Sequence, residues 1–158
     1  MTQLHANLIT SLRAFPQQLI TAIADLDDAC MLAHPLAGEW SIAQNVHHLA
    51  DSHMNAFIRC RLIASESNPP LKPYDQDAWA GFGDSQTANV SASLAILQGL
   101  HQRWADFFVN LADSDWERVG YHPELGAVSL HRQLVGYVAH GEEHLDQIAR
   151  TLAAYRQA

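Results

Sequence analysis

Two histidines lie four residues apart near the end of the sequence, in the run His140-Gly141-Glu142-Glu143-His144. On an α-helix, side chains at this spacing point within roughly 40° of each other, because each residue turns the helix by about 100°. Two imidazoles placed in this way can chelate one metal ion, as they do in HExxH helices. The spacing alone also fits a pair of surface histidines, so the neighbouring residues must discriminate between the two interpretations.

The residues around these histidines favour a metal site. Polar side chains follow one face of the predicted helix, beside an apolar stripe that faces the core. A polar group at the edge of a core must be satisfied inside the protein, and a bound cation would satisfy it. The polar face consists of Gln133, Tyr137, His140, His144 and Gln147, and the apolar stripe consists of Leu134, Val138, Leu145, Ile148 and Leu152.

A catalytic metal site needs a third protein ligand, with water or substrate in the remaining position. The adjacent pair His47-His48 lies in an earlier predicted helix. On the helical wheel His48 borders the apolar stripe, whereas His47 faces solvent, so His48 is the predicted ligand. His53 falls within the apolar stripe and is predicted to be a hydrogen-bonded core histidine. Two roles fit Asp51: a hydrogen-bond partner that orients a metal ligand, or an ordinary solvated aspartate.

Other catalytic motifs do not fit. The run His140-x-x-Glu143-His144 matches the HxxEH pattern of inverzincin proteases, but that class takes a further glutamate from well downstream. Carboxylate di-iron bundles need a Glu-x-x-His motif on two helices, which the sequence lacks. No GxSxG, P-loop or GxGxxG motif occurs.

Four segments with helical periodicity position these residues, and none alternates with the period of a strand. They cover residues 2–28, 41–65, 87–111 and 129–155, and Pro16 should kink or split the first. Ser41 and Gln44 form a predicted capping box at the start of the second. Residues 71–83 form a long crossover loop, and residues 113–128 form an irregular segment that can hold a short hairpin. We therefore expect an all-α four-helix bundle that comprises residues 1–158 as a single domain.

Composition excludes several classes of protein. The formal net charge is −8, Lys72 is the only lysine and no basic run occurs, so we expect no nucleic-acid partner. No apolar run approaches the roughly 20 residues that span a membrane, and the first residues lack the features of a signal peptide. Cys30 and Cys60 are isolated, which argues against a zinc ribbon or a disulfide scaffold. A cytoplasmic location is the resulting expectation.

Three stretches of the sequence resemble the DinB/YfiT-like superfamily, and particularly its YfiT branch. They are GEWSIAQNVHHLADSHMN at residues 38–55, PYDQDAW at residues 73–79, and the closing section with HPELG at residues 122–126 and HLDQI at residues 144–148. The resemblance implies a four-helix bundle with one divalent metal ion, zinc or nickel, on His48, His140 and His144. These are the three residues that the helical wheels select.

Members of this superfamily are described as metal-dependent hydrolases or as thiol S-transferases that use bacillithiol, mycothiol or glutathione, and some are homodimers. By this analogy we expect an enzyme that joins a small-molecule thiol to an electrophilic substrate. A metal-dependent hydrolase is the first alternative, and a non-catalytic, dimeric metal-binding bundle is the second. A fourth protein ligand such as His53 or Asp51 would favour the non-catalytic bundle, because structural zinc sites are closed by four protein ligands.

The sequence also offers candidate residues around the metal. Tyr137 and Glu143 are candidate acid/base groups. Arg59 and Asn55 are candidate substrate-binding residues, because they share the face of His48; the alternative for Arg59 is a structural salt bridge. Asp51 and Gln147 are the candidates for orienting the ligands from behind.

Overall fold

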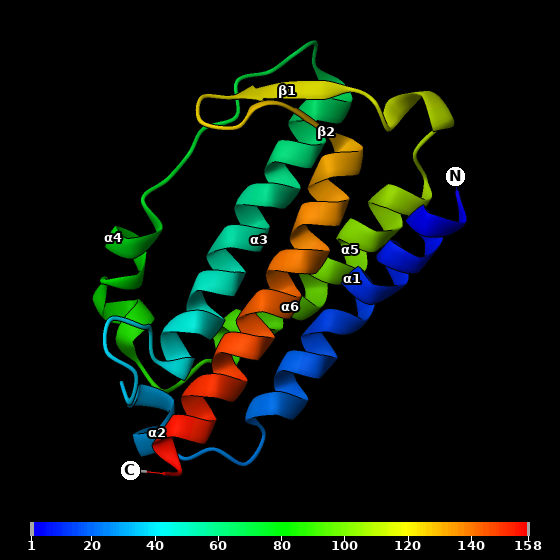
Figure 1. Cartoon of the computed structure of the whole chain (residues 1–158). Coiled ribbons are helices and arrows are strands. Elements are labelled where there is room, and N and C mark those ends of the chain that lie inside the picture. The colour runs from blue at the N-terminus through cyan, green and yellow to red at the C-terminus, as the bar shows by residue number, and fades with distance from the viewer. Residues whose placement is uncertain (1, 158) are drawn as a thin grey trace.

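Four long helices form a bundle in the computed structural model, which describes residues 2–157 (Figure 1). They are α1 (Gln3–Ile23), α3 (Ile42–Ser65), α5 (Ser91–Val109) and α6 (Leu130–Tyr155). Around the bundle, α1 packs against α5 and α6, and α3 packs against the same two helices. The predicted all-α four-helix bundle is confirmed.

The first helix is shorter than predicted. Helix α1 continues through Pro16 without splitting and ends at Ile23. The chain then turns into a separate short helix, α2 (Asp28–Leu32), whose first turn is capped by the Asp27 side chain. The prediction of one helix to residue 28 was therefore wrong, because Asp27 begins a new helix instead of ending the old one.

The second long helix begins at the predicted signal. The Ser41 hydroxyl accepts a hydrogen bond from the Gln44 backbone N–H, and the Gln44 side chain accepts one from the Ser41 backbone. This capping box satisfies two N–H groups that would otherwise lack partners at the helix start. It fixes the register of α3 and hence the directions of His48 and His53.

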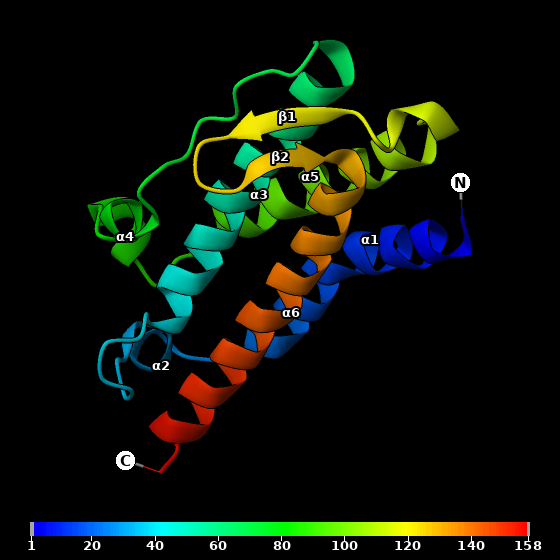
Figure 2. The same cartoon turned by 45° about the horizontal axis from the view of Figure 1, so that its top comes forward.

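The crossover connection between α3 and α5 has structure of its own. It contains a short helix, α4 (Gln76–Ala80), and a 3-10 turn, η1 (Gly83–Gln86), both of which pack on α3 (Figure 2). The Gln44 amide donates a hydrogen bond to the Ala80 carbonyl and so ties α4 to the start of α3. Helix α5 begins at Ser91, four residues later than predicted, because the Asn89 side chain bonds Ser91 and keeps the chain in a turn.

The predicted hairpin before the last helix is present. After a 3-10 turn, η2 (Asp113–Asp115), strands β1 (Val119–His122) and β2 (Gly126–Ser129) pair antiparallel, with Gly120 opposite Val128. Gly126 closes the turn with a φ of 71°, a backbone conformation that glycine adopts without strain. The hairpin leads directly into α6, whose first turn is capped by the Ser129 hydroxyl.

A layer of histidines divides the buried core into two parts. One apolar cluster gathers around Trp104 and Phe108, and the other around Leu19 and Ile42. Buried His53 and His101 contact both clusters, because each ring packs against Phe15 and against Trp104. Together with the neighbouring rings of His48, His140 and His144 they form the histidine layer. No helix among the described residues combines the length and apolar character that crossing a lipid bilayer requires.

Candidate metal centre

The side chains of His48, His140 and His144 meet between α3 and α6. The Nε2 atom of His140 lies 3.4 Å from that of His48 and 3.2 Å from that of His144. One ligand atom from each of the three residues lies within 4.8 Å of the other two. The helical register of α6 and the capping box of α3 therefore bring together the three imidazoles that the sequence selects.

The spacing of these nitrogens fits a divalent metal ion. Zinc bonds imidazole nitrogen at about 2.0–2.1 Å, so two such ligands at a tetrahedral angle lie about 3.3–3.4 Å apart. The distances of 3.2 and 3.4 Å between the Nε2 atoms agree with this geometry. The donor set of three imidazole nitrogens also suits nickel and other divalent transition metals.

Asn45 fixes the orientation of His144. The Asn45 side chain donates from Nδ2 to the Ser41 carbonyl at 3.0 Å, so its Oδ1 is left as an acceptor for Nδ1 of His144 at 2.7 Å. A neutral imidazole that donates from Nδ1 carries a lone pair on Nε2. His144 consequently presents this lone pair to His48 and His140, the arrangement that a shared metal ion would require.

A second set of contacts lies behind His140. His53 is fully buried and its Nε2 lies 3.2 Å from Nδ1 of His140, while its Nδ1 lies 2.7 Å from Nε2 of His101. His53 is thus the hydrogen-bonded core histidine that the sequence predicts. It is not part of the group of three ligands, and neither is Asp51.

Burial keeps the histidines of this layer neutral. It lowers the pKa of His48 to about 3, helped by the neighbouring His144 and His140. It lowers the pKa of His140 and of His144 to about 4, and His144 adds to the effect on His140. Metal ligation needs unprotonated imidazole, so the three side chains are in the binding form at neutral pH.

Trp40 covers one side of the three histidines. Its ring centroid lies 4.7 Å from that of His48 and 6.3 Å from that of His144. A pocket of about 230 Å³ opens beside it, lined by Gly38, Glu39, Trp40, Gln76, Asp77, His144 and Gln147. Through this pocket His144 is reached from the surface.

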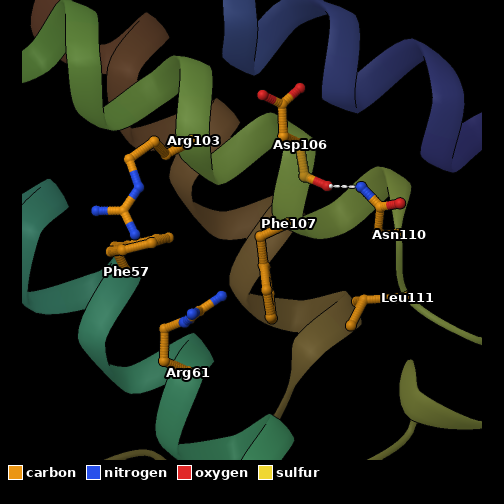
Figure 3. Close-up of a pocket in the computed structure, with 7 residues that line it drawn as sticks. All are labelled: Phe57, Arg61, Arg103, Asp106, Phe107, Asn110 and Leu111. Atoms are coloured by element: carbon orange, nitrogen blue, oxygen red, sulfur yellow. Dashed lines mark hydrogen bonds between the residues drawn. The ribbon is translucent and has the colours of Figure 1, made fainter.

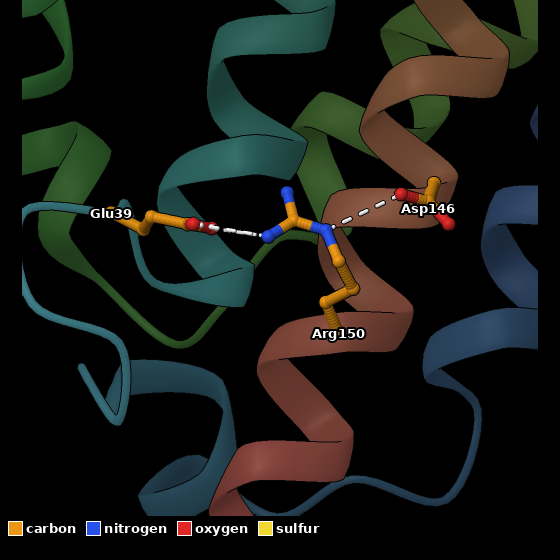
Figure 4. Close-up of polar contacts among 3 residues, drawn as sticks. All are labelled: Glu39, Asp146 and Arg150. Carbon is orange, nitrogen blue, oxygen red and sulfur yellow. Dashed lines mark hydrogen bonds and ion pairs between the residues drawn. The ribbon is translucent and has the colours of Figure 1, made fainter.

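An ion-pair network holds the segment that carries Trp40. Arg150 on α6 lies 3.0 Å from the carboxylate of Glu39 and 3.3 Å from that of Asp146 (Figure 4). Exposed pairs of this kind are screened by solvent and contribute little to stability. Their effect here is to join the residue before Trp40 to the helix that provides two of the three histidines.

A connected group of polar side chains from three elements reaches His140 through Tyr137. The Tyr137 ring lies 5.5 Å from the His140 ring, and burial raises the pKa of Tyr137, although hydrogen bonds from Ser52 and Arg59 oppose the rise. Burial also raises the pKa of Tyr74, which comes from the crossover connection and is likewise bonded to Ser52. Arg59 donates to the backbone carbonyl of Lys72. No acidic side chain among residues 2–157 forms an ion pair with Arg59, so the predicted alternative of a structural salt bridge is not observed.

The remaining candidate residues are Glu143, Asn55, Asp51 and Gln147. Glu143 is exposed, and Asn55 is half-buried and donates to the Asp51 carbonyl of its own helix. Burial raises the pKa of the Asp51 carboxyl, and the charges that act on it belong to Asp84 and His47. Gln147 lines the pocket at His144.

His47 departs from its predicted solvent-facing position. It is half-buried, and its Nδ1 lies 2.8 Å from the Ser93 hydroxyl while its Nε2 lies 3.1 Å from the Thr87 carbonyl. The start of α5 and the turn before it cover this side of α3, which a helical wheel of α3 alone does not reveal. As predicted, His47 lies outside the group of three ligands.

A separate pocket of about 470 Å³ lies between α3 and α5 (Figure 3). Two arginines stack on its aromatic rings: the Arg61 guanidinium lies 5.7 Å from the Phe57 centroid, and that of Arg103 lies 5.4 Å from the same ring. None of the predicted site residues lines this pocket. This pocket is larger than the one at His144, but it is separate from the histidine site.

Comparison with known proteins identifies relatives that cover most of the chain. A proposed metal-dependent hydrolase from Oceanobacillus iheyensis is 37% identical over 140 residues, which cover 89% of this chain and 81% of the relative. A second proposed metal-dependent hydrolase, YfiT from Bacillus subtilis, is 40% identical over 141 residues, which cover 89% of this chain and 79% of the relative.

The fold comparison agrees. A solved structure of Bacillus subtilis YfiT, described as a probable metal-dependent hydrolase with an unusual four-helix bundle topology, superposes with a TM-score of 0.91. The match is 37% identical and covers 96% of this chain and 87% of that structure. Residues 11–148 also match the sequence profile of the DinB superfamily. The chain therefore belongs to the DinB superfamily and is a homologue of YfiT.

Proposed function

We propose that this protein is a divalent-metal-dependent enzyme in which His48, His140 and His144 hold one metal ion that activates a thiol or a water molecule. The convergence of three neutral imidazoles carries the proposal: the Nε2 atom of His140 lies at ligand spacing from that of His48 and that of His144, and all three ligand atoms lie within 4.8 Å of one another. Zinc and nickel are the ions we propose, since three imidazole ligands suit both. The relatives named as metal-dependent hydrolases support the dependence on a metal.

The arrangement supports a catalytic role more than a structural one. Structural zinc sites are closed by four protein ligands, whereas catalytic sites keep a position for water or substrate. Only three residues join the group of ligands within residues 2–157, and a pocket reaches one of them from the surface. A divalent cation in this position supplies Lewis-acid chemistry, which lowers the pKa of a bound nucleophile towards neutrality.

The neighbouring side chains can bind and orient a substrate. Because its pKa is raised, Tyr137 keeps its proton at neutral pH and can donate a hydrogen bond to an oxygen or to a leaving group. Arg59 has no carboxylate partner among the described residues and can bind a substrate carboxylate. Trp40 shields the histidines on the other side. Glu143 remains a weaker candidate for acid/base catalysis, because it is exposed.

The finer proposal is transfer of a low-molecular-weight thiol to an electrophile. The thiol loses its proton to solvent, its sulfur forms a bond to the electrophilic carbon, and the leaving group departs with the bonding electrons and takes up a proton. The resemblance to thiol S-transferases supports this reaction. Arg59 supports it as well, because it has no carboxylate partner among the described residues and can bind the carboxylates of bacillithiol or glutathione. Hydrolysis, with water as the nucleophile, is the second candidate, and the names of the relatives support it.

Metal analysis and paired histidine variants test the proposal. We expect about one equivalent of zinc or nickel in the wild-type protein, and loss of the metal and of activity in His48→Ala, His140→Ala and His144→Ala. His47→Ala is the matched control, because His47 lies next to His48 on the same helix and bonds Ser93 instead. Full metal content in all three ligand variants would refute the site.

A substrate panel decides between the two reactions. Metal-loaded protein is assayed with bacillithiol, mycothiol and glutathione against haloalkane and epoxide electrophiles, and in parallel with ester and amide substrates without thiol. Turnover that requires a thiol supports transfer, whereas thiol-independent turnover supports hydrolysis. Stoichiometric metal binding without turnover of either panel would favour the non-catalytic metal-binding bundle. Light scattering on the same samples measures whether the protein is the expected homodimer.

A further inference from the structure

A row of three hydrogen bonds crosses the middle of the bundle and ends at the metal centre. It begins at the Leu12 carbonyl of α1, which lies 2.6 Å from Nδ1 of His101 on α5. Nε2 of His101 lies 2.7 Å from Nδ1 of His53 on α3, and Nε2 of His53 lies 3.2 Å from Nδ1 of His140 on α6. Each of the four long helices thus contributes one member, and His53 and His101 are almost completely buried.

The first acceptor sets the direction of every bond in the row. A carbonyl can only accept, so His101 must donate from Nδ1 to Leu12. A neutral imidazole has one donor and one acceptor nitrogen, which leaves Nε2 of His101 as an acceptor for Nδ1–H of His53. By the same step, Nε2 of His53 accepts from Nδ1–H of His140. The Nε2 of His140 then carries the lone pair, and this is the atom that faces His48 and His144.

The alternation of one donor and one acceptor along the row requires neutral rings. The nearly complete burial of His53 and His101 favours that state, because removal from water disfavours a charge. A protonated histidine in the row would donate from both nitrogens and oppose its neighbour.

The sequence of α1 explains why Leu12 is available as the first acceptor. In an α-helix the Leu12 carbonyl would accept from the backbone N–H four residues later, at position 16. That residue is Pro16, which has no N–H, so its place in the helix leaves the carbonyl without its ordinary partner. A buried carbonyl in this state needs another donor, and His101 supplies it.

We propose that His101 and His53 are positioning residues that, from the carbonyl freed by Pro16, hold His140 in the Nδ1–H tautomer with its Nε2 lone pair directed at the metal. The proposal rests on the proposed metal centre. It goes beyond that centre because it assigns a role to two buried histidines that contact no metal. A pair of ordinary core histidines would contribute to stability and would leave the metal affinity unchanged.

Variants of His101 separate these two roles. In His101→Gln, the amide keeps both an acceptor for His53 and a donor for Leu12, whereas His101→Met keeps only the volume. We expect His101→Met to bind Zn²⁺ about 10- to 100-fold more weakly in competition with a chelator, as loss of a group that orients a metal ligand generally does, and His101→Gln to retain most of the affinity. His5→Met is the control for lost stability, since His5 is also buried but lies against Trp116, away from the row.

The tautomers can also be measured without any substitution. In metal-free wild-type protein, long-range ¹H–¹⁵N NMR should show the proton of His140, of His53 and of His101 on Nδ1. A proton on Nε2 of His140 would overturn the proposal, as would equal Zn²⁺ affinity in wild type and in a folded His101→Met. If the wild type binds no Zn²⁺ or Ni²⁺, the proposed function fails, and the NMR measurement on metal-free protein still decides on the tautomers.

Discussion

The histidine layer should make the metal-free protein sensitive to mild acid. Four of its members, His48, His101, His140 and His144, have folded-state pKa values of about 3 to 4, against 6.5 for the same side chains when exposed. The unfolded chain therefore binds more protons than the folded protein between these two values. Stability is complete above pH 6.5 and is lost as the pH falls through this window.

The size of the effect follows from the linkage between protonation and folding. At pH 5.5 each of these histidines favours the unfolded chain by about 1.4 kcal/mol, and the four together by about 6 kcal/mol, before His53 is considered. Domains of this size have a free energy of unfolding of about 5–15 kcal/mol. The metal-free protein should thus lose a third or more of its stability between pH 7.5 and pH 5.5.

Urea unfolding in the presence of a chelator measures this loss. We expect the free energy of unfolding to drop by several kcal/mol between the two pH values, and His101→Gln, which removes one titrating group, to reduce the drop by about 1 kcal/mol. His34→Gln is the control, because His34 is exposed. A free energy of unfolding that stays constant down to pH 5.5 would refute the burial of neutral histidines and, with it, the geometry of the metal centre.

Three further predictions concern affinity, packing and substrate binding. The Zn²⁺ affinity of the folded protein should stay nearly constant between pH 7.5 and 6.0, whereas three ligands with ordinary pKa values would lose about 50-fold to proton competition; a chelator titration at each pH distinguishes the two. Gly141→Ala should destabilise the protein by about 1–3 kcal/mol in thermal or urea unfolding, because the new Cβ would lie 2.8 Å from the Phe15 ring. The control is Gly136→Ala on the same helix, where the new Cβ meets no neighbour and should stabilise the protein by about 0.5–1 kcal/mol. Arg59→Met should raise the KM for a carboxylate-bearing substrate by about tenfold with little change in kcat, and the control Arg61→Met should not; equal kinetics in the two variants would remove Arg59 from the site.

Local sequence patterns predicted the three ligand candidates because their directions depend on helical register alone. The spacing of His140 and His144 places both on one face of α6, and the capping box at Ser41 fixes the register of α3. Amphipathic periodicity then turns His48 towards the bundle interior. The helical wheel also predicted the burial of His53, whereas the hairpin before α6 was predicted from Gly120, Pro123 and Gly126 in an irregular segment.

Residues that act across helices could not be predicted in this way. His101 lies on α5 among Leu97, Trp104 and Phe108, so its sequence context is that of an ordinary core helix. Asn45 is a buried polar residue one turn before His48, but its partner His144 lies 99 residues further along the chain. Short helices were missed where one capping aspartate, such as Asp75 before α4, was the only local signal.

Pro16 shows how a local feature acquires its meaning from tertiary structure. From the sequence it indicates a kink or a break in the first helix, yet α1 runs through it. Its chemical consequence is the loss of one backbone N–H, and the bundle places His101 where that loss leaves an acceptor. Because a proline in a helix interior costs about 3 kcal/mol relative to alanine, Pro16→Ala should stabilise α1 if the proline has only a local role. In the arrangement we describe, the restored N–H at position 16 competes with His101 for the Leu12 carbonyl. Pro16→Ala should therefore weaken Zn²⁺ binding while it stabilises the helix. A gain in stability without any loss of Zn²⁺ affinity would show that Pro16 does not act on the metal centre.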